Sequence, residues 1–160
     1  MTRKMTKRRP ITVDDDKLLN QLERVEECLL EPMAGRTQAW AERVEWALDE
    51  LTEGLDQHQA VAEADSGPFA QEDLKGPMLP TMDLRVEKLR QEHLRLQSLI
   101  RALRRQLQEI AQPFADGPKV IDLLKIRRRG RQLLQDIRRH KENETILLME
   151  NVNMDIGAGD

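Results

Sequence analysis

The sequence predicts an all-α protein, an antiparallel four-helix bundle formed as one domain by residues 13–160. Its composition favours helix over sheet, because aromatic residues make up only 2% of the chain and tyrosine is absent, whereas leucine, glutamate, arginine, glutamine and alanine are abundant. Apolar residues also recur at three- and four-residue intervals in four segments. Two short breaks and one longer middle break separate these segments, which is the arrangement expected of an up-and-down bundle.

The first helix is expected from Asp14 to about Met33. Residues 1–12 precede it and predict a disordered basic tail, in which Pro10 prevents an early helix. Asp14–Asp16 supply an N-cap and an acidic first turn, which suit the positive end of a helix dipole. The inward-facing stripe of this helix is expected to hold Leu19, Leu22, Glu26, Leu29 and Leu30.

The second helix is expected over residues 38–64, after a break at Ala34-Gly35 and with Thr37 as its N-cap. Its stripe places His58 among apolar residues. The expected members are Trp40, Val44, Ala47, Leu48, Leu51, Leu55, His58, Val61 and Ala62. The following residues contain two Gly-Pro pairs and Pro80, and they predict a long loop over residues 65–81.

The third helix, expected over residues 82–112, has the most regular pattern of the four. Its stripe is Val86, Leu89, His93, Leu96, Ile100, Leu103, Leu107 and Ile110. The fourth helix is expected over residues 119–152, with Gly130 as a point of close approach or bending. Its stripe is Leu133, Ile137, His140, Glu144, Leu147, Leu148 and Asn151. The tail, residues 152–160, is expected to leave the helix and pack Ile156 against the bundle.

The chain has three histidines, and each falls on the inward stripe of a different helix. If a stripe covers about a third of a helix, random placement would do this in roughly one chain in thirty. Inward-facing histidine and glutamate are the ligands with which helix bundles hold metal ions, and imidazole with carboxylate suits iron, zinc or manganese. A single core histidine, however, is more often hydrogen-bonded to a neighbour than bound to metal. The spacing alone therefore leaves a metal site and a metal-free core both open.

Several segments together resemble a known family. The fourth helix contains an HxxxE pair, His140 and Glu144, and is followed by the tail DIGAGD. The second helix reads LDELTEGLDQHQAVAEADSGPF and the third LRQEHLRLQSLI. In this order the segments resemble the hemerythrin-like (HHE cation-binding) proteins over nearly the whole chain beyond the basic tail. The resemblance implies a hemerythrin-like bundle that holds non-heme iron.

The family's typical ligand set, five histidines and two carboxylates around two irons, is incomplete here. Glu26 stands where the first helix should carry histidine, and Ala62 stands where a carboxylate is expected, with Glu63 the nearest acid. Leu89 and Gln97 occupy the positions one turn from His93 where a second histidine is expected. The candidate metal ligands are therefore His58, His93, His140 and Glu144, with Glu26 and Glu63 as substitutes.

Two functions follow from these observations. The first is a hemerythrin-like domain in a sensing, storage or scaffold role, which binds non-heme iron or another divalent metal, or has lost it. An open coordination position would accept a small diatomic ligand, oxygen or nitric oxide. The alternative is a metal-free helical bundle acting as a protein- or nucleic-acid-interaction module through the basic residues 1–10 and 125–141. No nucleophile–base pair or phosphate-binding loop is present, so we expect no enzymatic activity.

Composition also bounds the partners and the compartment. A pI near 5.7 and the lack of an aromatic platform make nucleic acid an unfavoured partner, whereas a protein partner or self-association through the third helix stays open. The single cysteine, Cys28, excludes an internal disulfide and fits a reducing cytoplasm. The basic N-terminus is not followed by an apolar stretch, and no apolar run approaches about 18 residues, so we expect no signal peptide, no membrane span and a cytoplasmic location.

Overall fold

The computed structural model describes residues 13–64, 79–112 and 122–157, and it describes side chains from residue 16 to residue 150 within those ranges except at 79–82. The described residues form four α-helices and no strand, which confirms the all-α prediction for this part of the chain. The helices are α1 (Val13–Leu30), α2 (Thr37–Glu63), α3 (Leu79–Ala111) and α4 (Leu123–Gly157). The predicted basic tail, residues 1–12, lies outside the described residues.

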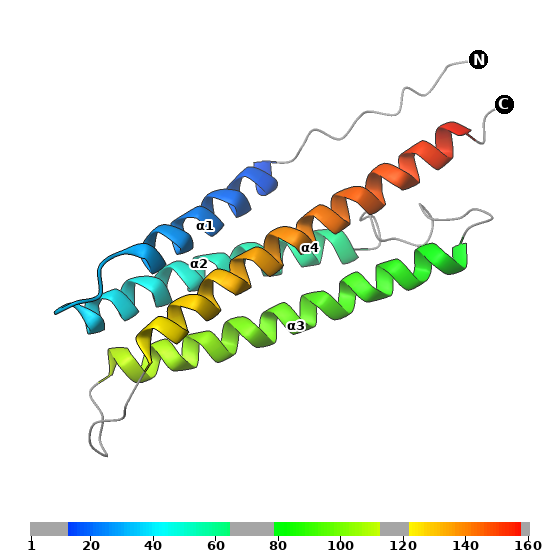
Figure 1. Ribbon diagram of the computed structural model, residues 1–160. Coiled ribbons are helices and arrows are strands. Elements are labelled where there is room, and N and C mark those ends of the chain that lie inside the picture. Colours follow the sequence, from blue (N-terminus) through cyan, green and yellow to red (C-terminus); the bar gives the residue numbers. More distant parts are fainter. Residues whose placement is uncertain (1–12, 65–78, 113–121, 158–160) are drawn as a thin grey trace.

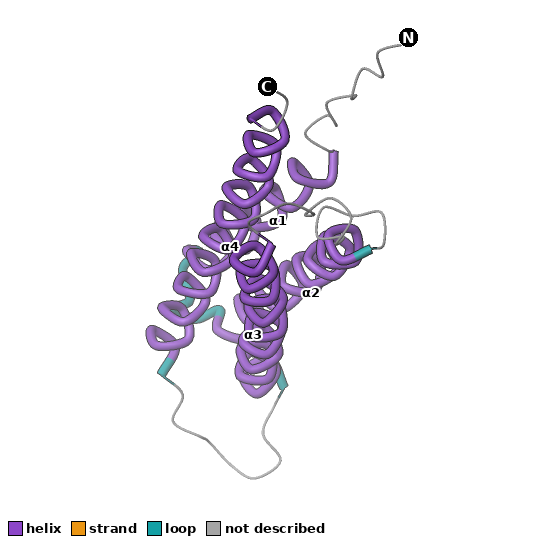
Figure 2. The backbone as a smooth tube through the Cα atoms, turned by 90° about the vertical axis from the view of Figure 1, so that its right-hand side faces the viewer, coloured by secondary structure: helices purple, strands orange, loops and turns teal. Residues whose placement is uncertain are grey.

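The four helices lie side by side along one long axis (Figure 1). Each helix packs against its neighbours in the chain, and α4 also contacts α1, which closes the bundle. Figure 2 shows α3 between α2 and α4, with α1 behind them. The end of α1 and the start of α2 lie at the same end of the bundle as the end of α3 and the start of α4 (Figure 1). At the opposite end, α3 and α4 extend beyond α1 and α2.

Each helix contributes one row of side chains to the main core. The rows of α2, α3 and α4 largely follow the predicted stripes. Val61 is exposed, Ile110 and Leu148 are only partly buried, and the Asn151 side chain lies outside the described residues. The main core consists of Leu18, Leu22, Val25, Leu29, Trp40, Ala41, Val44, Ala47, Leu48, Leu51, Leu55, Leu96, Ile100, Leu103, Leu107, Ile126, Leu133, Leu134 and Ile137. A second, smaller core lies beyond it, formed by Ala62, Val86, Leu89 and Leu147.

The predicted stripe of α1 is rotated by one residue from the observed one. The buried row is Leu18, Leu22, Val25 and Leu29. Leu19 and Leu30, which the prediction placed inside, are 45% and 53% exposed. The pairs of adjacent leucines at both ends of α1 allow two stripe positions, and packing against α2 and α4 selects the one that passes through Val25. Glu26 is therefore beside the buried row and not on it.

The turn between α1 and α2 begins earlier than predicted. Pro32 restricts the backbone of the residue before it, and α1 accordingly ends at Leu30, whereas the prediction extended it to about Met33. Gly35 then adopts a left-handed conformation with φ of 70°, which glycine tolerates without a steric penalty. Thr37 is the first residue of α2, and its hydroxyl donates to the Met33 carbonyl at 3.4 Å, so it is not the predicted N-cap.

The ends of α3 and α4 also differ from the prediction. Pro80 lies in the first turn of α3, where its missing N–H has no helical partner to lose, so α3 begins within the predicted loop. The α4 helix begins after Asp122, whose carboxylate accepts a hydrogen bond from the Lys125 backbone N–H at 3.0 Å, as an N-cap does. The helix continues to Gly157, so the prediction that the chain leaves it after Asn151 is wrong. Residues 152–156 include neither glycine nor proline, so nothing in them ends the helix. The Ile156 side chain lies outside the described residues.

Gly130 is a point of close approach between α4 and α1. A Cβ atom at this position would lie 2.8 Å from both terminal methyl groups of Leu29. Glycine therefore lets the two helix backbones come together where a side chain would collide. None of the described helices is both long and apolar enough to cross a bilayer.

Candidate metal centre

The three histidines and Glu144 meet between α2, α3 and α4. His58 comes from the last two turns of α2, His93 from α3, and His140 and Glu144 from successive turns of α4. We call these four residues the histidine cluster. His93, His140 and Glu144 are buried, whereas His58 is partly exposed. Each is on the inward stripe of its helix, and the packing of the helices places all four at one level along the bundle axis.

The Glu144 carboxylate is the centre of the cluster. Its Oε2 lies 2.5 Å from Nε2 of His58. Its Oε1 lies 2.8 Å from Nε2 of His93 and 2.7 Å from Nε2 of His140. The same ring nitrogen of all three histidines therefore faces one carboxylate. The His93 and His140 rings are also adjacent, with centroids 4.4 Å apart.

Two further carboxylates hold the outer nitrogens of the buried histidines. Nδ1 of His93 lies 3.3 Å from Oε1 of Glu63, and Nδ1 of His140 lies 2.7 Å from Oε2 of Glu92. We call Glu63 and Glu92 the outer carboxylates. They retain 30% and 26% of their side-chain exposure, so their charges remain in contact with solvent. Each buried histidine thus has a carboxylate on both of its ring nitrogens.

Apolar side chains cover the cluster along the bundle axis on both sides. On the side of the main core these are Leu55, Leu96 and Ile137, and on the other side Ala62, Leu89 and Leu147. Each is one helical turn from a member of the cluster. These layers exclude water, so the polar atoms of the cluster must be satisfied by one another or by a bound ion.

Counting protons shows that the cluster does not satisfy itself with neutral imidazoles. A neutral imidazole has one N–H and one lone pair, so it can donate to only one carboxylate. His140 has Glu92 on one nitrogen and Glu144 on the other. Its Nε2 is fully buried and, despite the 2.7 Å separation from Glu144, has no partner with hydrogen-bond geometry. The inner face of His140 therefore needs either an extra proton or a cation.

The electrostatics of the cluster lead to the same requirement. Burial by itself would lower the pKa of His140, but the adjacent carboxylates of Glu144 and then Glu92 raise that pKa above its ordinary value. Burial would likewise raise the pKa of Glu144, but the imidazoles of His140, His58 and His93 around it lower that pKa far below its ordinary value. Glu144 is therefore a charged carboxylate in the interior, and it requires positive charge beside it.

The donor atoms are close enough to share one ion. His58, His93 and Glu144 each offer one ligand atom, and these atoms lie within 4.8 Å of one another. Nε2 of His140 contacts the same oxygen of Glu144 as Nε2 of His93. Donors bound to one zinc-sized ion stand about 3 to 3.5 Å apart. His58, His93 and Glu144 are thus compatible with a single ion, and His140, which contacts the same Glu144 oxygen as His93, would join them as a fourth ligand.

The structure does not bring Glu26 to the cluster. Its carboxylate accepts a hydrogen bond from Arg138 at 2.8 Å. The neighbouring Arg24 pairs with Glu50 on α2, two turns before His58, so this part of α1 lies about 12 Å from the cluster along the axis. The sequence prediction was therefore wrong both about the face of α1 on which Glu26 lies and about its position along the bundle axis.

The other two carboxylates have outer positions. Glu63, a predicted substitute ligand, reaches the outer nitrogen of His93 and not the shared centre. Glu92 was not predicted at all, although it follows Leu89 by three residues and precedes Leu96 by four, so it borders the same stripe as His93. Acidic residues that flank an inward histidine are the sequence feature that could have identified it.

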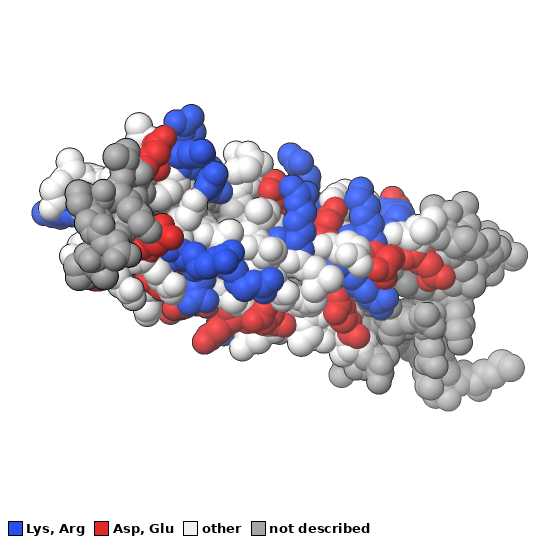
Figure 3. Space-filling view, turned by 90° about the horizontal axis from the view of Figure 1, so that it is seen from below, with Lys and Arg blue, Asp and Glu red and all other residues white. Residues whose placement is uncertain are grey.

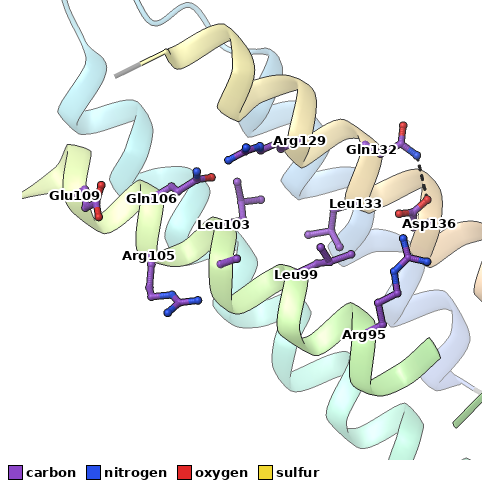
Figure 4. A pocket seen from close by; sticks show the side chains of 11 residues that line it. Arg95, Leu99, Leu103, Arg105, Gln106, Glu109, Arg129, Gln132, Leu133 and Asp136 are labelled. Atoms are coloured by element: carbon purple, nitrogen blue, oxygen red, sulfur yellow. Dashed lines mark hydrogen bonds between the residues drawn. The ribbon is translucent and has the colours of Figure 1, made fainter. Parts of the chain in front are cut away.

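One pocket lies apart from the cluster. It has a volume of about 700 Å³ and lies between α3 and α4, with Leu99, Leu103 and Leu133 at its base and Arg129 pointing across it (Figure 4). A smaller pocket of about 110 Å³ reaches His140 and is also lined by Glu92. Glu92 contacts Nδ1 of His140, and Nε2 of His140 is buried. This pocket therefore adjoins the His140 ring on the side that carries Nδ1.

Charges of both signs share the surface. Lysine and arginine side chains alternate with aspartate and glutamate on the face seen in Figure 3. Several arginines are paired across helices, among them Arg104 with Asp49 and Arg138 with Glu26. This face therefore lacks the uniform positive field that phosphate backbones require.

Comparison with known proteins gives no assignment. No protein-family model matches the chain, no curated protein matches its sequence, and no solved structure matches its fold. The functional argument accordingly depends on the geometry and chemistry of the histidine cluster.

Proposed function

We propose that the chain is a hemerythrin-like domain, an antiparallel four-helix bundle that binds one divalent metal ion, foremost non-heme iron, at the histidine cluster. The observation that carries the proposal is the pair of carboxylates on each buried histidine. With a metal ion at the centre, Nε2 of His93 and of His140 offers its lone pair, and Nδ1–H donates to Glu63 or Glu92. This arrangement satisfies both nitrogens of each ring without an extra proton.

One ion fits these residues better than two. The positions that would complete a two-iron set are held by Ala62 and Leu89, which offer no donor, and by Gln97. The Gln97 amide nitrogen donates to Asp56 at 3.1 Å and to Gln59 at 2.7 Å, so it serves the surface of α2. Glu26, the remaining substitute, is paired with Arg138.

The chain's own residues define what the site can do. His93, His140 and Glu144 hold the ion within an apolar interior, and the outer carboxylates fix the orientation of two rings. Bound iron would supply a coordination position for a small diatomic ligand such as oxygen or nitric oxide. For such a domain we propose a sensing, storage or scaffold role.

Metal analysis of protein purified without a histidine tag tests this proposal. After chelator treatment, anaerobic titration with Fe(II), and separately with Zn(II) and Mn(II), should saturate at one ion per chain. Glu144→Gln should abolish saturation, whereas Glu142→Gln, a change at an exposed position of the same helix, should leave it intact. Two ions per chain would contradict the single-ion site, and none would remove the metal-binding function.

A metal-free interaction module is the second candidate, and one exposed aromatic residue favours it. Trp46 on α2 is 56% exposed, and the guanidinium of Arg24 lies 5.6 Å from its ring centroid. Tryptophan and arginine are the residues most enriched at the energetic centres of protein interfaces. Sedimentation of the wild type and of Trp46→Ala tests whether this surface mediates self-association. If it does, the apparent mass of the wild type should rise with protein concentration, and that of Trp46→Ala should not.

A further inference from the structure

Resting on the proposed metal site, we infer that His58 is its exchangeable ligand. His93, His140 and Glu144 form a fixed three-residue holder for the ion, and a small external ligand reaches the ion by taking the place of the His58 imidazole. Three independent features of the structure distinguish His58 from the other members of the cluster.

The first feature is support on the outer side of each ring. His93 is held between Glu144 and Glu63, and His140 between Glu144 and Glu92. His58 contacts Glu144 through Nε2, and within the described residues its Nδ1 has no hydrogen-bond partner. A ligand whose second nitrogen is fixed keeps its orientation when the bond to the metal lengthens. The His58 ring lacks that restraint and can turn away.

The second feature is exposure. The side chain of His58 is 18% exposed, against 4% for both His93 and His140 and 6% for Glu144. Water or another small ligand can therefore approach the cluster beside His58 without displacing a core side chain. Approach to the inner nitrogens of the other two rings requires passing the outer carboxylates or opening the apolar layers.

The third feature is position along the helix. The α2 helix ends at Glu63, little more than one turn after His58, whereas His93 and His140 lie well inside α3 and α4. The last turns of a helix open locally at a lower free energy than its centre. Motion of the end of α2 would withdraw His58 while the α3 and α4 ligands stay in place.

The smaller pocket, of about 110 Å³, does not offer an equivalent route. It reaches His140 beside Glu92, on the side of the ring that carries Nδ1. Nε2, which faces the shared centre, is fully buried. A molecule in this pocket would meet the His140–Glu92 pair before it met a bound ion.

Matched alanine variants test the inference through metal release. Zn(II)- or Co(II)-loaded wild type, His58→Ala, His93→Ala and His140→Ala are mixed with excess chelator, and release is followed by indicator dye or by the Co(II) absorption spectrum. We expect His58→Ala to keep one ion per chain and release it about 10- to 100-fold faster than wild type, if losing this weakly held ligand costs as much affinity as losing an outer-shell partner does. His93→Ala and His140→Ala should not retain the ion at equimolar metal.

Rescue by free imidazole separates an exchangeable ligand from a merely structural residue. Millimolar imidazole should slow release from His58→Ala and restore the Co(II) spectrum towards that of the wild type, because the vacated position is open to solvent. It should not rescue His93→Ala or His140→Ala. Circular dichroism melts establish that each variant is folded, and His58→Gln, which preserves more of the side-chain volume, replaces His58→Ala should the latter not fold.

The outcomes of this experiment and of the metal titration are distinguishable. A wild type that binds no metal contradicts the proposed function itself. A wild type that binds one ion, with His58→Ala and His93→Ala equally unable to retain it, overturns the inference and leaves the metal site standing. Imidazole rescue of His140→Ala but not of His58→Ala would also overturn it, since it would show that external ligands enter between α3 and α4.

Discussion

The two ends of this bundle are built on the same helical spacing, but they differ in what fills the interior. At one end, all four helices contribute apolar side chains, among them Leu29, Trp40, Leu107 and Leu134. At the other end, α2, α3 and α4 contribute the histidine cluster, and α1 contributes none of its members. Beyond the cluster, the small second core contains residues of the same three helices.

The difference shows how stability and function are divided along one core. An apolar side chain needs only to be covered, so the apolar end tolerates small changes in the rotation and level of its helices. A buried imidazole or carboxylate needs a partner for each polar atom, and an unmet atom costs free energy. The histidine end therefore demands that each polar atom has a partner, a requirement that the proposed ion at its centre would complete. The following predictions test this division, from the largest expected effect to the smallest.

Truncation at the apolar end should reduce stability and leave metal binding unchanged. Leu134 is 1% exposed, and Leu134→Ala should lower the free energy of unfolding by about 2 to 5 kcal/mol, because it removes buried methyl groups and leaves a cavity. Chemical denaturation followed by circular dichroism measures the change. Ile146→Ala, at a 48% exposed position, is the control and should change stability by no more than about 0.5 kcal/mol. Equal losses at both positions would contradict the assignment of the core.

Converting the histidine end into an apolar core should abolish metal binding without loss of stability. Replacing buried ion pairs by apolar residues of similar volume is often neutral or stabilising by about 1 to 4 kcal/mol. The metal-free triple variant His93→Leu, His140→Leu and Glu144→Leu should therefore unfold at the same or a higher denaturant concentration than the metal-free wild type. Glu63 and Glu92 lose their partners in this variant but retain contact with solvent. A strongly destabilised triple variant would mean that the polar contacts themselves hold this end together.

The pH dependence of stability should differ between the metal-free and the metal-bound protein. In the metal-free protein, the lowered pKa of Glu144 contributes stability that is present above its ordinary value of 4.5 and is lost as pH falls below it. The raised pKa of His140 contributes stability that is present below its ordinary value of 6.5 and is lost as pH rises through the folded-state value. Metal-free protein should thus be most stable between pH 4.5 and 6.5.

With metal present, protons compete with the ion for the imidazole nitrogens, so stability should instead increase as pH rises through this range. Thermal melts across pH, with chelator and with excess Zn(II), measure both curves. Glu144→Gln should weaken the dependence of the metal-free melting temperature on pH. Curves that coincide with and without metal would contradict binding at the cluster.

The smallest effect is expected at the contact between α1 and α4. Gly130→Ala would place a methyl group against Leu29, which is fully buried and has little room to move. Overpacking of this kind costs about 1 to 3 kcal/mol, whereas replacing a helical glycine by alanine contributes about 1 kcal/mol of stability. We expect a net loss of about 1 kcal/mol by denaturation, with Ser98→Ala, an exposed position of α3, as the neutral control. A stabilised Gly130→Ala would show that α1 can move away.

Prediction from the sequence succeeded where a helix has one possible apolar stripe. In α3, every predicted position from Val86 to Leu107 is buried, because the spacing of its leucines admits no second stripe. In α1, adjacent leucines at both ends allow two stripes one residue apart, and the wrong one was predicted. The same uncertainty placed Glu26 inside, and it is found paired with Arg138.

By itself, the sequence determined that the described part of the chain forms four helices and that His93, His140 and Glu144 face the interior of the bundle, because side-chain direction along a helix follows from its period. Only the tertiary structure decided which carboxylates serve these rings. The level of one helix against another depends on side-chain packing and on the lengths of the connections, and neither is contained in the period of a single helix. That level places Glu63 and Glu92 behind the two buried rings and leaves Glu26 about 12 Å away along the axis.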